Sequence, residues 1–466
     1  MSLTGQLNDL MKALEAGSYN AAPGTLSQGA SLQVEDLSPV MEVVTFDDSH
    51  IKLQKMLSVK DAKSQLIQFN RQLDYGTFGG SAQFEGGIGE EDTSAYVRAI
   101  VPMSYYSTTR RVSVAANMIG AFDGQQAEDR AGNDGAIKLS ADIEFDSFRG
   151  QDDFSNGGLF DGSPAAISDM PNMRGAGSQI RESDSITNTQ DLMFAEYGSD
   201  QTVIVSVNGV LKQTHVEDSA VKSAMQHGSA DAMVLDPISL SAYNKIAHAK
   251  ERIMLAGSAQ EGTGAHLRTQ WTSSSVVSME PSRFLAGKTR PARARAGSPA
   301  APATLTSAAA ADTASALAAG TYWYKVTSAN ERGESVEKVD DGGSQVVASG
   351  EKVTLTIAAV TGAKYFNVYR SEDGGNSATA KFIGRVKASG SGATSFVDLG
   401  GRSPGFVTGY LVQKSTMGFH QLAAYSRLKL ALSDLSLPEA HFRFICLAAY
   451  QPRKNVILDN IDGQLS

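Results

Sequence analysis

Leucine and methionine recur at helical spacing near the start of the chain. Within residues 2–16, apolar side chains fall three or four positions apart and form one stripe of Leu3, Leu7, Leu10, Met11 and Leu14. Residues 17–40 follow without a period and are rich in Gly, Ala and Ser. The pattern predicts a short amphipathic helix on an extended arm. Its stripe fits either packing on its own domain or contact with another subunit or an assembly factor.

Two polar and aromatic runs, residues 66–75 and 95–106, predict a pair of strands joined by a glycine-rich segment. Roughly 20 residues between two strands is longer than a compact domain usually accommodates. We therefore expect a long hairpin with a flexible end, which projects and packs on something outside its own core.

Helical and strand patterns alternate in the middle of the chain. Apolar residues spaced three and four apart in 135–148 predict a core-facing helix that begins upstream near Gln125. A strand at 201–209, a helix at 218–227, a buried strand at 232–235 and a helix from Pro237 to about Ile253 are expected to follow. Mixed α+β packing is the simplest interpretation.

The composition changes at Lys288, where a stretch rich in Ala, Ser, Thr and Pro predicts a linker up to Ala319. Short strands separated by glycine turns then predict a β-sandwich, with strands at 321–328, 352–358, 364–370, 382–387 and 394–399. Strands at 441–450 and near 456–461 resemble the missing closing strands of the first domain. The sandwich would then be an insertion held at both ends.

Composition and charge narrow the function classes. The chain has 466 residues, enough for two or three folded units, with 41% hydrophobic and 20% charged residues. Residues 61–200 hold 10 Lys and Arg against 22 Asp and Glu, which gives this region a net charge of −12. The remaining residues sum to +3, so the whole chain carries −9. Such a balance disfavours a tight, sequence-reading grip on nucleic acid but permits weak proximity to it. A solvated acidic face that limits aggregation explains the charge equally well. No apolar run of about 18 residues and no secretory signal is readable, so we expect neither a membrane span nor export.

Signals for catalysis and for metal binding are sparse. None of the seven histidines lies three or four positions from another, and no phosphate-binding or serine-elbow motif occurs. The acidic clusters at 90–92 and 152–153 stand in glycine-rich surroundings that are typical of exposed turns. The single cysteine, Cys446, lies in an apolar run that predicts a buried strand, which fits a reducing cytoplasm. We expect no enzyme activity, no metal and no cofactor.

The order of these elements resembles the major capsid protein of large tailed bacteriophages. The local strings that carry the resemblance are residues 68–76 leading into 96–98, the helix at 136–150, and 159–162, 235–237, 366–370, 396–398 and 447–454. The resemblance implies an α+β fold of the Hong Kong ninety-seven type with an inserted immunoglobulin-like β-sandwich. Its implied domains are an N-terminal helix and arm (1–60), an extended hairpin or E-loop (61–109), a peripheral and axial core (110–289), the sandwich (290–410) and closing strands (411–466).

The resemblance also implies a function. The chain would self-assemble through many weak contacts, as hexamers and pentamers, into the icosahedral shell that holds viral double-stranded DNA. It would be formed in the host cytoplasm and located in the virion capsid. Scaffolding, cement and portal proteins, and packaged DNA held non-specifically, would be its partners, with no membrane involved. The expected assembly interface consists of Leu7, Leu10, Leu14, Phe78, Phe84, Tyr96 and Arg98.

Two further points bear on this expectation. No lysine occurs from Ser64 to Ile137, so the hairpin cannot supply a lysine crosslink and the shell would depend on noncovalent contacts or cement proteins. Two alternatives stay open: another virion subunit such as a tail sheath or tube protein, and a carbohydrate-binding surface protein with an immunoglobulin-like domain.

Overall fold

A computed structural model describes most of the chain from Asp48 onward. The described residues are 48–72, 82–89, 91, 93–119, 126–151, 171–185, 202–248, 269–292, 294, 296–390, 392–432 and 434–463. The helix predicted for residues 2–16, with Leu7, Leu10 and Leu14, lies outside them, as does Phe78. Among the described residues no helix has the length and apolar character needed to cross a membrane.

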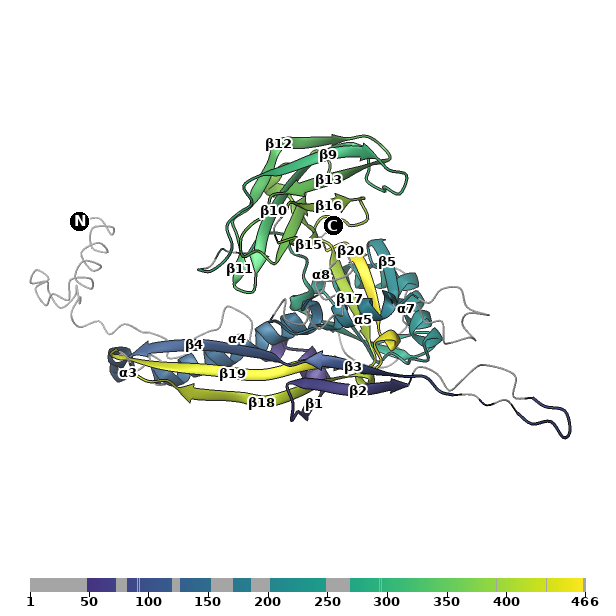
Figure 1. Cartoon of the computed structure of the whole chain (residues 1–466), viewed down its shortest axis with the longest axis horizontal. Helices are drawn as coiled ribbons and strands as arrows, with labels where there is room; N and C mark the ends of the chain where they lie inside the picture. Colours follow the sequence, from purple (N-terminus) through teal and green to yellow (C-terminus); the bar gives the residue numbers. More distant parts are fainter. Residues whose placement is uncertain are drawn as a thin grey trace, which may run out of the picture.

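A long four-stranded sheet forms one side of the body (Figure 1). Its order is β1 (Ser58–Asp61), β18 (Met417–Lys429), β19 (Ser436–Ala449) and β4 (Ser104–Ser113), with only the β1–β18 pair parallel. Helix α4 (Ala127–Arg149) lies along one face, and the short α3 (Val114–Ile119) follows β4. The core-facing helix predicted over 135–148 with an upstream start is confirmed.

A second, six-stranded sheet stands beside the first. Its order is β5 (Ile204–Gly209), β20 (Val456–Ile461), β17 (Val407–Val412), β6 (Ala232–Leu235), β8 (Val276–Pro281) and β7 (Thr269–Trp271). Helices α7 (Gln213–Met225) and α8 (Pro237–His248) cover one face. The predicted strand at 232–235 and the helix start at Pro237 are confirmed, whereas α7 begins five residues before the predicted 218.

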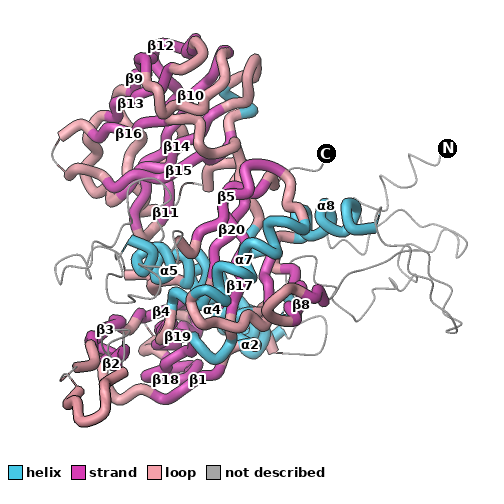
Figure 2. The backbone as a smooth tube through the Cα atoms, turned by 90° about the vertical axis from the view of Figure 1, so that its right-hand side faces the viewer, coloured by secondary structure: helices cyan, strands magenta, loops and turns pink. Residues whose placement is uncertain are grey.

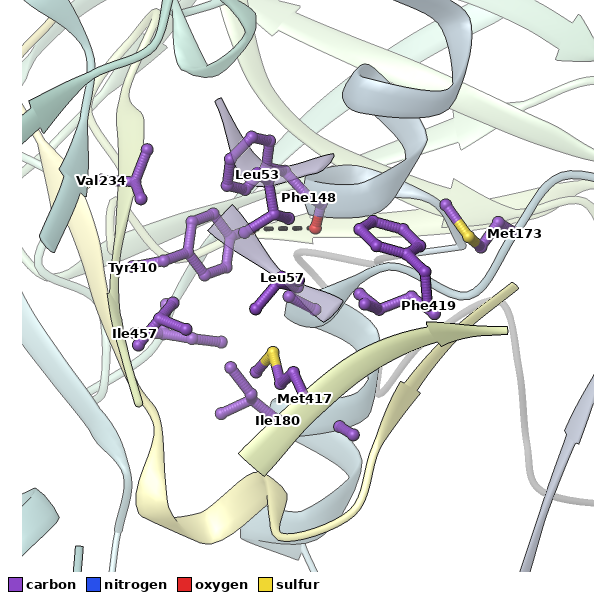
Figure 3. Packing of buried hydrophobic residues seen from close by; sticks show 14 of the residues in the cluster. Leu53, Leu57, Phe148, Met173, Ile180, Val234, Tyr410, Met417, Phe419 and Ile457 are labelled. Carbon is purple, nitrogen blue, oxygen red and sulfur yellow. Dashed lines mark hydrogen bonds between the residues drawn. The ribbon is translucent and has the colours of Figure 1, made fainter. Parts of the chain in front are cut away.

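The other face of the six-stranded sheet packs against the rest of the body (Figure 3). Helices α2 (Leu53–Met56) and α5 (Ala176–Ser185), the end of α4 and strand β18 contribute to this core. Tyr410 of β17 meets Phe148 of α4 at 5.5 Å between ring centroids, and its hydroxyl donates to the Phe148 carbonyl at 3.2 Å. Short 3-10 turns complete the body at Asp48–His50, Arg283–Leu285, Lys414–Thr416 and Pro452–Lys454.

Residues 305–398 form two further sheets with a core of their own (Figure 2). One contains β11 (Gly333–Glu334), β10 (Gly320–Asn330), β14 (Tyr365–Arg370) and β15 (Lys381–Lys387), with β12 (Lys338–Val347) also paired to β10. The other contains β16 (Thr394–Asp398), β13 (Glu351–Ile357) and β9 (Leu305–Ala311), and a 3-10 turn spans Ser377–Thr379. We call this two-sheet unit the sandwich; its immunoglobulin-like classification stays a prediction.

Two sequence expectations fail within the sandwich. The predicted linker contains β9, which pairs with β13 along its whole length. Its side chains are Ala, Ser and Thr apart from Leu305, so its alternation between the two faces leaves no apolar signal. The prediction also omits β12, whose residues 338–339 and 344–347 pair with β10, while residues 340–343 between them form an irregularity in which Gly343 has a positive φ of 80°.

Strands β2 (Leu66–Gln72) and β3 (Tyr96–Pro102) form a two-stranded hairpin at one end of the long sheet (Figure 1). The expectation of one strand over 95–106 is wrong, because β3 ends at Pro102 and β4 begins at Ser104. Proline lacks the N–H that a continuous ladder needs. Met103 is buried between the two strands, and its N–H donates to the Gln65 carbonyl at 2.9 Å. The chain therefore passes from the hairpin into the long sheet at this residue.

Candidate assembly surfaces

The inner face of the hairpin is fixed to the body. Val101 and Met103 are buried with Cys446 of β19, and Ile67 and Phe69 pack against this cluster. The Phe69 ring meets the Tyr450 ring edge-on at 5.2 Å between centroids. These contacts make the root of the hairpin part of the molecule's own core.

Arg71 strengthens this attachment. Its guanidinium donates to the Ala449 carbonyl at 2.7 Å and to the Tyr450 carbonyl at 2.9 Å, at the end of β19. Burial lowers the pKa of Arg71 from its usual value, but the group stays charged at any physiological pH. The hairpin therefore leaves the body at a fixed position.

The outer face of the hairpin has the opposite character. The antiparallel register places Leu66, Ile100 and Tyr96 on this face, because residues two positions apart share a side of the strand. All three are exposed, Tyr96 to 66%. Arg98 lies among them and is also exposed, with its Nε 3.4 Å from the Asn70 side-chain oxygen across the strand pair. No described residue covers this face.

The described part of the hairpin tip, residues 82–89, exposes two large apolar side chains. Phe84 is 96% exposed and Ile88 is 92% exposed. Burying such a side chain contributes about 1.5–3 kcal/mol, and the chain by itself lacks this stabilisation at both positions. Apolar groups presented in this way are typical of a surface that another molecule covers.

A second apolar surface lies at the opposite end of the long sheet, and the sequence analysis did not identify it. We call it the distal surface; its exposed members are Met118, Leu428, Leu430, Leu432 and Leu435. Leu428 lies at the end of β18, and Leu430, Leu432 and Leu435 lie in the connection to β19. Their alternation at 428, 430 and 432 is the signal that one apolar face is presented there.

The sequence-predicted interface residues thus divide into two groups. Phe84, Tyr96 and Arg98 lie on the hairpin, on its outer face or at its tip, and all are exposed. Phe78 and the three N-terminal leucines lie outside the described residues, so their role stays a prediction.

Buried carboxyl groups position the long helix between these surfaces. Glu144 of α4 accepts hydrogen bonds from the N–H groups of Lys52, Leu53 and Gln54 at 2.6–3.1 Å, and so caps the start of α2. Burial raises the pKa of Glu144, and these N–H groups oppose the rise.

Asp146, two residues later, accepts from the Tyr106 hydroxyl of β4 at 2.7 Å, and the same hydroxyl accepts from the Met173 N–H at 3.0 Å. Burial raises the pKa of Asp146 to about 6. The strand that continues from the hairpin is thereby tied to the helix.

The sandwich is joined to the body where the chain enters and leaves it. Lys288 pairs with Glu334, and its carbonyl accepts from the Phe382 N–H at 3.1 Å. The Phe382 carbonyl in turn accepts from the Gly405 N–H at 2.8 Å. Strands on either side of this unit, β6 before it and β17 after it, pair in the six-stranded sheet.

The described residues offer little chemistry. They contain no group of three His, Cys, Asp or Glu side chains that could hold a metal ion. Cys446 is fully buried beneath the hairpin root, as its apolar run predicts, and burial raises the pKa of its thiol to about 12. A thiol in this state is a poor nucleophile.

Comparison with known proteins gives structural likeness only. No family model matches the sequence, and no curated protein matches it. Among solved structures, the capsid of a native GTA particle is 11% identical, covers 96% of this chain and 100% of its own, and has a TM-score of 0.47. A structure from Mycobacterium phage Ogopogo is 9% identical over 95% of this chain and 100% of its own, with a TM-score of 0.44. The holo encapsulin complex of Synechococcus elongatus is 8% identical over 96% and 98%, with a TM-score of 0.42. Such values assign neither a family nor a function, so both must rest on the surfaces of this chain.

Proposed function

We propose that this chain is the major capsid protein of a tailed bacteriophage, a shell subunit that assembles through contacts between copies. The observation that carries the proposal is the hairpin, which is anchored on its inner face and uncovered on its outer face and tip. A segment that is anchored at its root and exposes Phe84, Ile88 and Tyr96 suits a contact that forms only on association.

The arrangement of the two apolar surfaces supports assembly beyond a dimer. The hairpin and the distal surface lie at opposite ends of the long sheet (Figure 1). Two different surfaces on one subunit permit head-to-tail contacts, which close into rings or shells rather than stopping at a pair. Modest individual contacts suffice, because each subunit makes several of them.

The proposal assigns roles to the other parts. The N-terminal stripe of Leu7, Leu10 and Leu14 and the tip residue Phe78 would contribute further contacts. The sandwich would stand on the shell exterior. The acidic region 61–200 would limit adhesion to packaged DNA.

The experiment compares wild type with a tip variant and a matched control. The tip variant is Phe84→Ser with Ile88→Ser; the control is Val336→Ser with Val346→Ser, two exposed residues of the sandwich. We expect wild type and control to form closed particles or rings in sedimentation velocity and negative-stain images, and the tip variant to stay dissociated with an unchanged circular dichroism spectrum. A tip variant that assembles like wild type, or a wild type that stays monomeric, would contradict the proposal. Stacked tubes would favour a tail subunit instead.

A further inference from the structure

Helix α4 and the long sheet meet through a cluster of charges near the distal surface. Arg427 of β18 lies at the centre: its Nε is 2.7 Å from Glu439 Oε2 on β19, and its Nη2 is 3.2 Å from Glu128 Oε1 on α4. Lys429 pairs with Glu128 and lies 4.0 Å from Glu439 Oε1. Two cations of the sheet therefore hold one carboxyl group of the helix and one of the sheet.

Both carboxyl groups are largely removed from water. Glu439 is 3% exposed and Glu128 is 9% exposed. Glu439 Oε1 is buried and receives no hydrogen bond from the described residues. A proton on that oxygen would supply a donor for the neighbouring Glu128 carboxylate, and would remove one of two like charges from a poorly hydrated site.

Glycines in α4 bring the helix close to this cluster. A Cβ on Gly132 would lie 2.8 Å from Arg427 Nη1, and one on Gly135 would lie 2.9 Å from the His441 ring. Each glycine in a helix interior costs about 1 kcal/mol relative to alanine. The first turns of α4 are thus intrinsically weak and depend on their contact with the sheet.

The remaining charged and titratable neighbours are few. Asp129 of α4 lies 3.5 Å from Arg427, and Arg110 of β4 faces the cluster. His441 of β19 is buried, with its Nδ1 2.9 Å from the Tyr425 hydroxyl. Burial, Arg427 and Arg110 all lower the pKa of His441 below its usual value of 6.5.

We propose that Glu128 and Glu439 form a proton-dependent clasp, which holds the first turns of α4 on the sheet while the pair carries a single proton. In that state protonated Glu439 donates to ionised Glu128, and Glu128 keeps its ion pairs with Arg427 and Lys429. If Glu128 also becomes protonated, the pair loses the negative charge that Arg427 and Lys429 hold. If Glu439 loses its proton, two carboxylates of like charge lie side by side.

The directions of the pKa shifts agree with this scheme. The hydrogen bond from Lys429, followed by that with Glu439, lowers the pKa of Glu128, so its stabilising effect is lost as pH falls through that pKa. Burial, followed by the hydrogen bond with Glu128, raises the pKa of Glu439, so its effect is lost as pH rises through that pKa. The clasp is tightest between the two.

Hydrogen exchange of the dissociated subunit tests the clasp without requiring assembly. Protection of residues 127–135, relative to residues 139–148 of the same helix, should pass through a maximum in a pH window that includes 4.5, the ordinary glutamate value that the two shifts flank, and fall at least about threefold on each side. Glu439→Gln, which keeps a donor, should abolish the alkaline loss, and Glu128→Gln should abolish the acid loss. Asp129→Asn, at an exposed neighbouring acid, should leave the maximum in place. A flat wild-type profile, or an alkaline loss that persists in Glu439→Gln, would overturn the proposal.

Discussion

The sandwich and the β2–β3 hairpin are both built from antiparallel strands, yet they treat their apolar residues in opposite ways. The sandwich encloses Tyr324, Phe366 and Leu355 between its own two sheets, all fully buried. The hairpin buries one face against Cys446 and leaves Tyr96 and Ile100 uncovered on the other. A two-stranded ribbon has no second layer of its own, so half of its side chains must find a partner elsewhere or stay in water.

The buried aspartates extend this contrast. In the sandwich, Asp398 accepts from Arg370 at 2.5 Å and from the Tyr324 hydroxyl at 2.9 Å. Beside β4, Asp146 accepts from the Tyr106 hydroxyl at 2.7 Å, and it forms no ion pair with the described residues. The sandwich satisfies its apolar and charged side chains within itself. The hairpin leaves apolar side chains exposed, and the helix α4 beside β4 keeps a buried carboxyl group without an ion pair among the described residues.

The largest expected effect is a difference in stability between core substitutions in the two regions. Phe366→Ala should cost about 3–5 kcal/mol of unfolding free energy, because it leaves a cavity in a closed core. Tyr96→Ala should cost less than about 0.5 kcal/mol in the dissociated subunit, since the ring is already in water. The cost of Phe366→Ala is measured by urea unfolding followed by Trp323 fluorescence in a Trp271→Phe background. Urea unfolding followed by amide circular dichroism measures the cost of each variant. Equal costs for the two variants would contradict the contrast between sandwich and hairpin.

The second prediction concerns Asp146 of α4, which accepts a hydrogen bond from Tyr106 of β4. Its folded pKa of about 6 exceeds the ordinary value of 3.8, so its contribution favours the folded state at low pH and is lost as pH rises through 6. Asp146→Asn should therefore stabilise the protein by up to about 3 kcal/mol at pH 8 and have little effect near pH 4. Chemical denaturation at the two pH values measures this. A variant that is less stable at pH 8 would show that the carboxylate is satisfied in the native state.

The third prediction uses Cys446 as a reporter of hairpin attachment. Arg71→Ala removes two charge-assisted hydrogen bonds to the end of β19. A hydrogen bond to a charged group contributes about 1.5–3 kcal/mol. Opening of the hairpin root should become at least tenfold more frequent, and alkylation of Cys446 under native conditions should accelerate accordingly. Arg98→Ala, on the uncovered face, is the matched control and should leave the labelling rate near that of wild type. Equal acceleration in both variants would contradict the assigned anchor.

The sequence predicts elements with large apolar residues on one face better than elements built from small or polar residues. Periodic apolar residues identify α4, β6 and the start of α8, because burial on one side imposes a period on the sequence. The sequence does not predict strand β9, because its half-buried positions are filled by small residues such as alanine and threonine, which give no apolar period. The boundary between β3 and β4 after Pro102 is not predicted either, because the pattern of polar and apolar residues continues across it.

The candidate surfaces show the same limit. Phe84 and Tyr96 are identifiable from the long glycine-rich connection, which signals a segment without its own core. The distal leucines alternate at 428, 430 and 432, but Leu428 and Leu432 have the same chemistry as buried residues, so the alternation alone does not indicate that this face is exposed. The clasp joins Glu128 to Arg427 and Lys429, which lie 299 and 301 positions later in the chain, and no local pattern indicates such a contact.

The account rests on the claim that a second copy covers the outer face and tip of the hairpin. Hydroxyl-radical footprinting of the same preparation, assembled and then dissociated, tests this most directly, with Val336 and Val346 of the sandwich as internal references. We expect oxidation of Phe84 and Tyr96 to fall at least about fivefold on assembly while the references stay unchanged. Equal oxidation of Phe84 and Tyr96 in both states would contradict the claim.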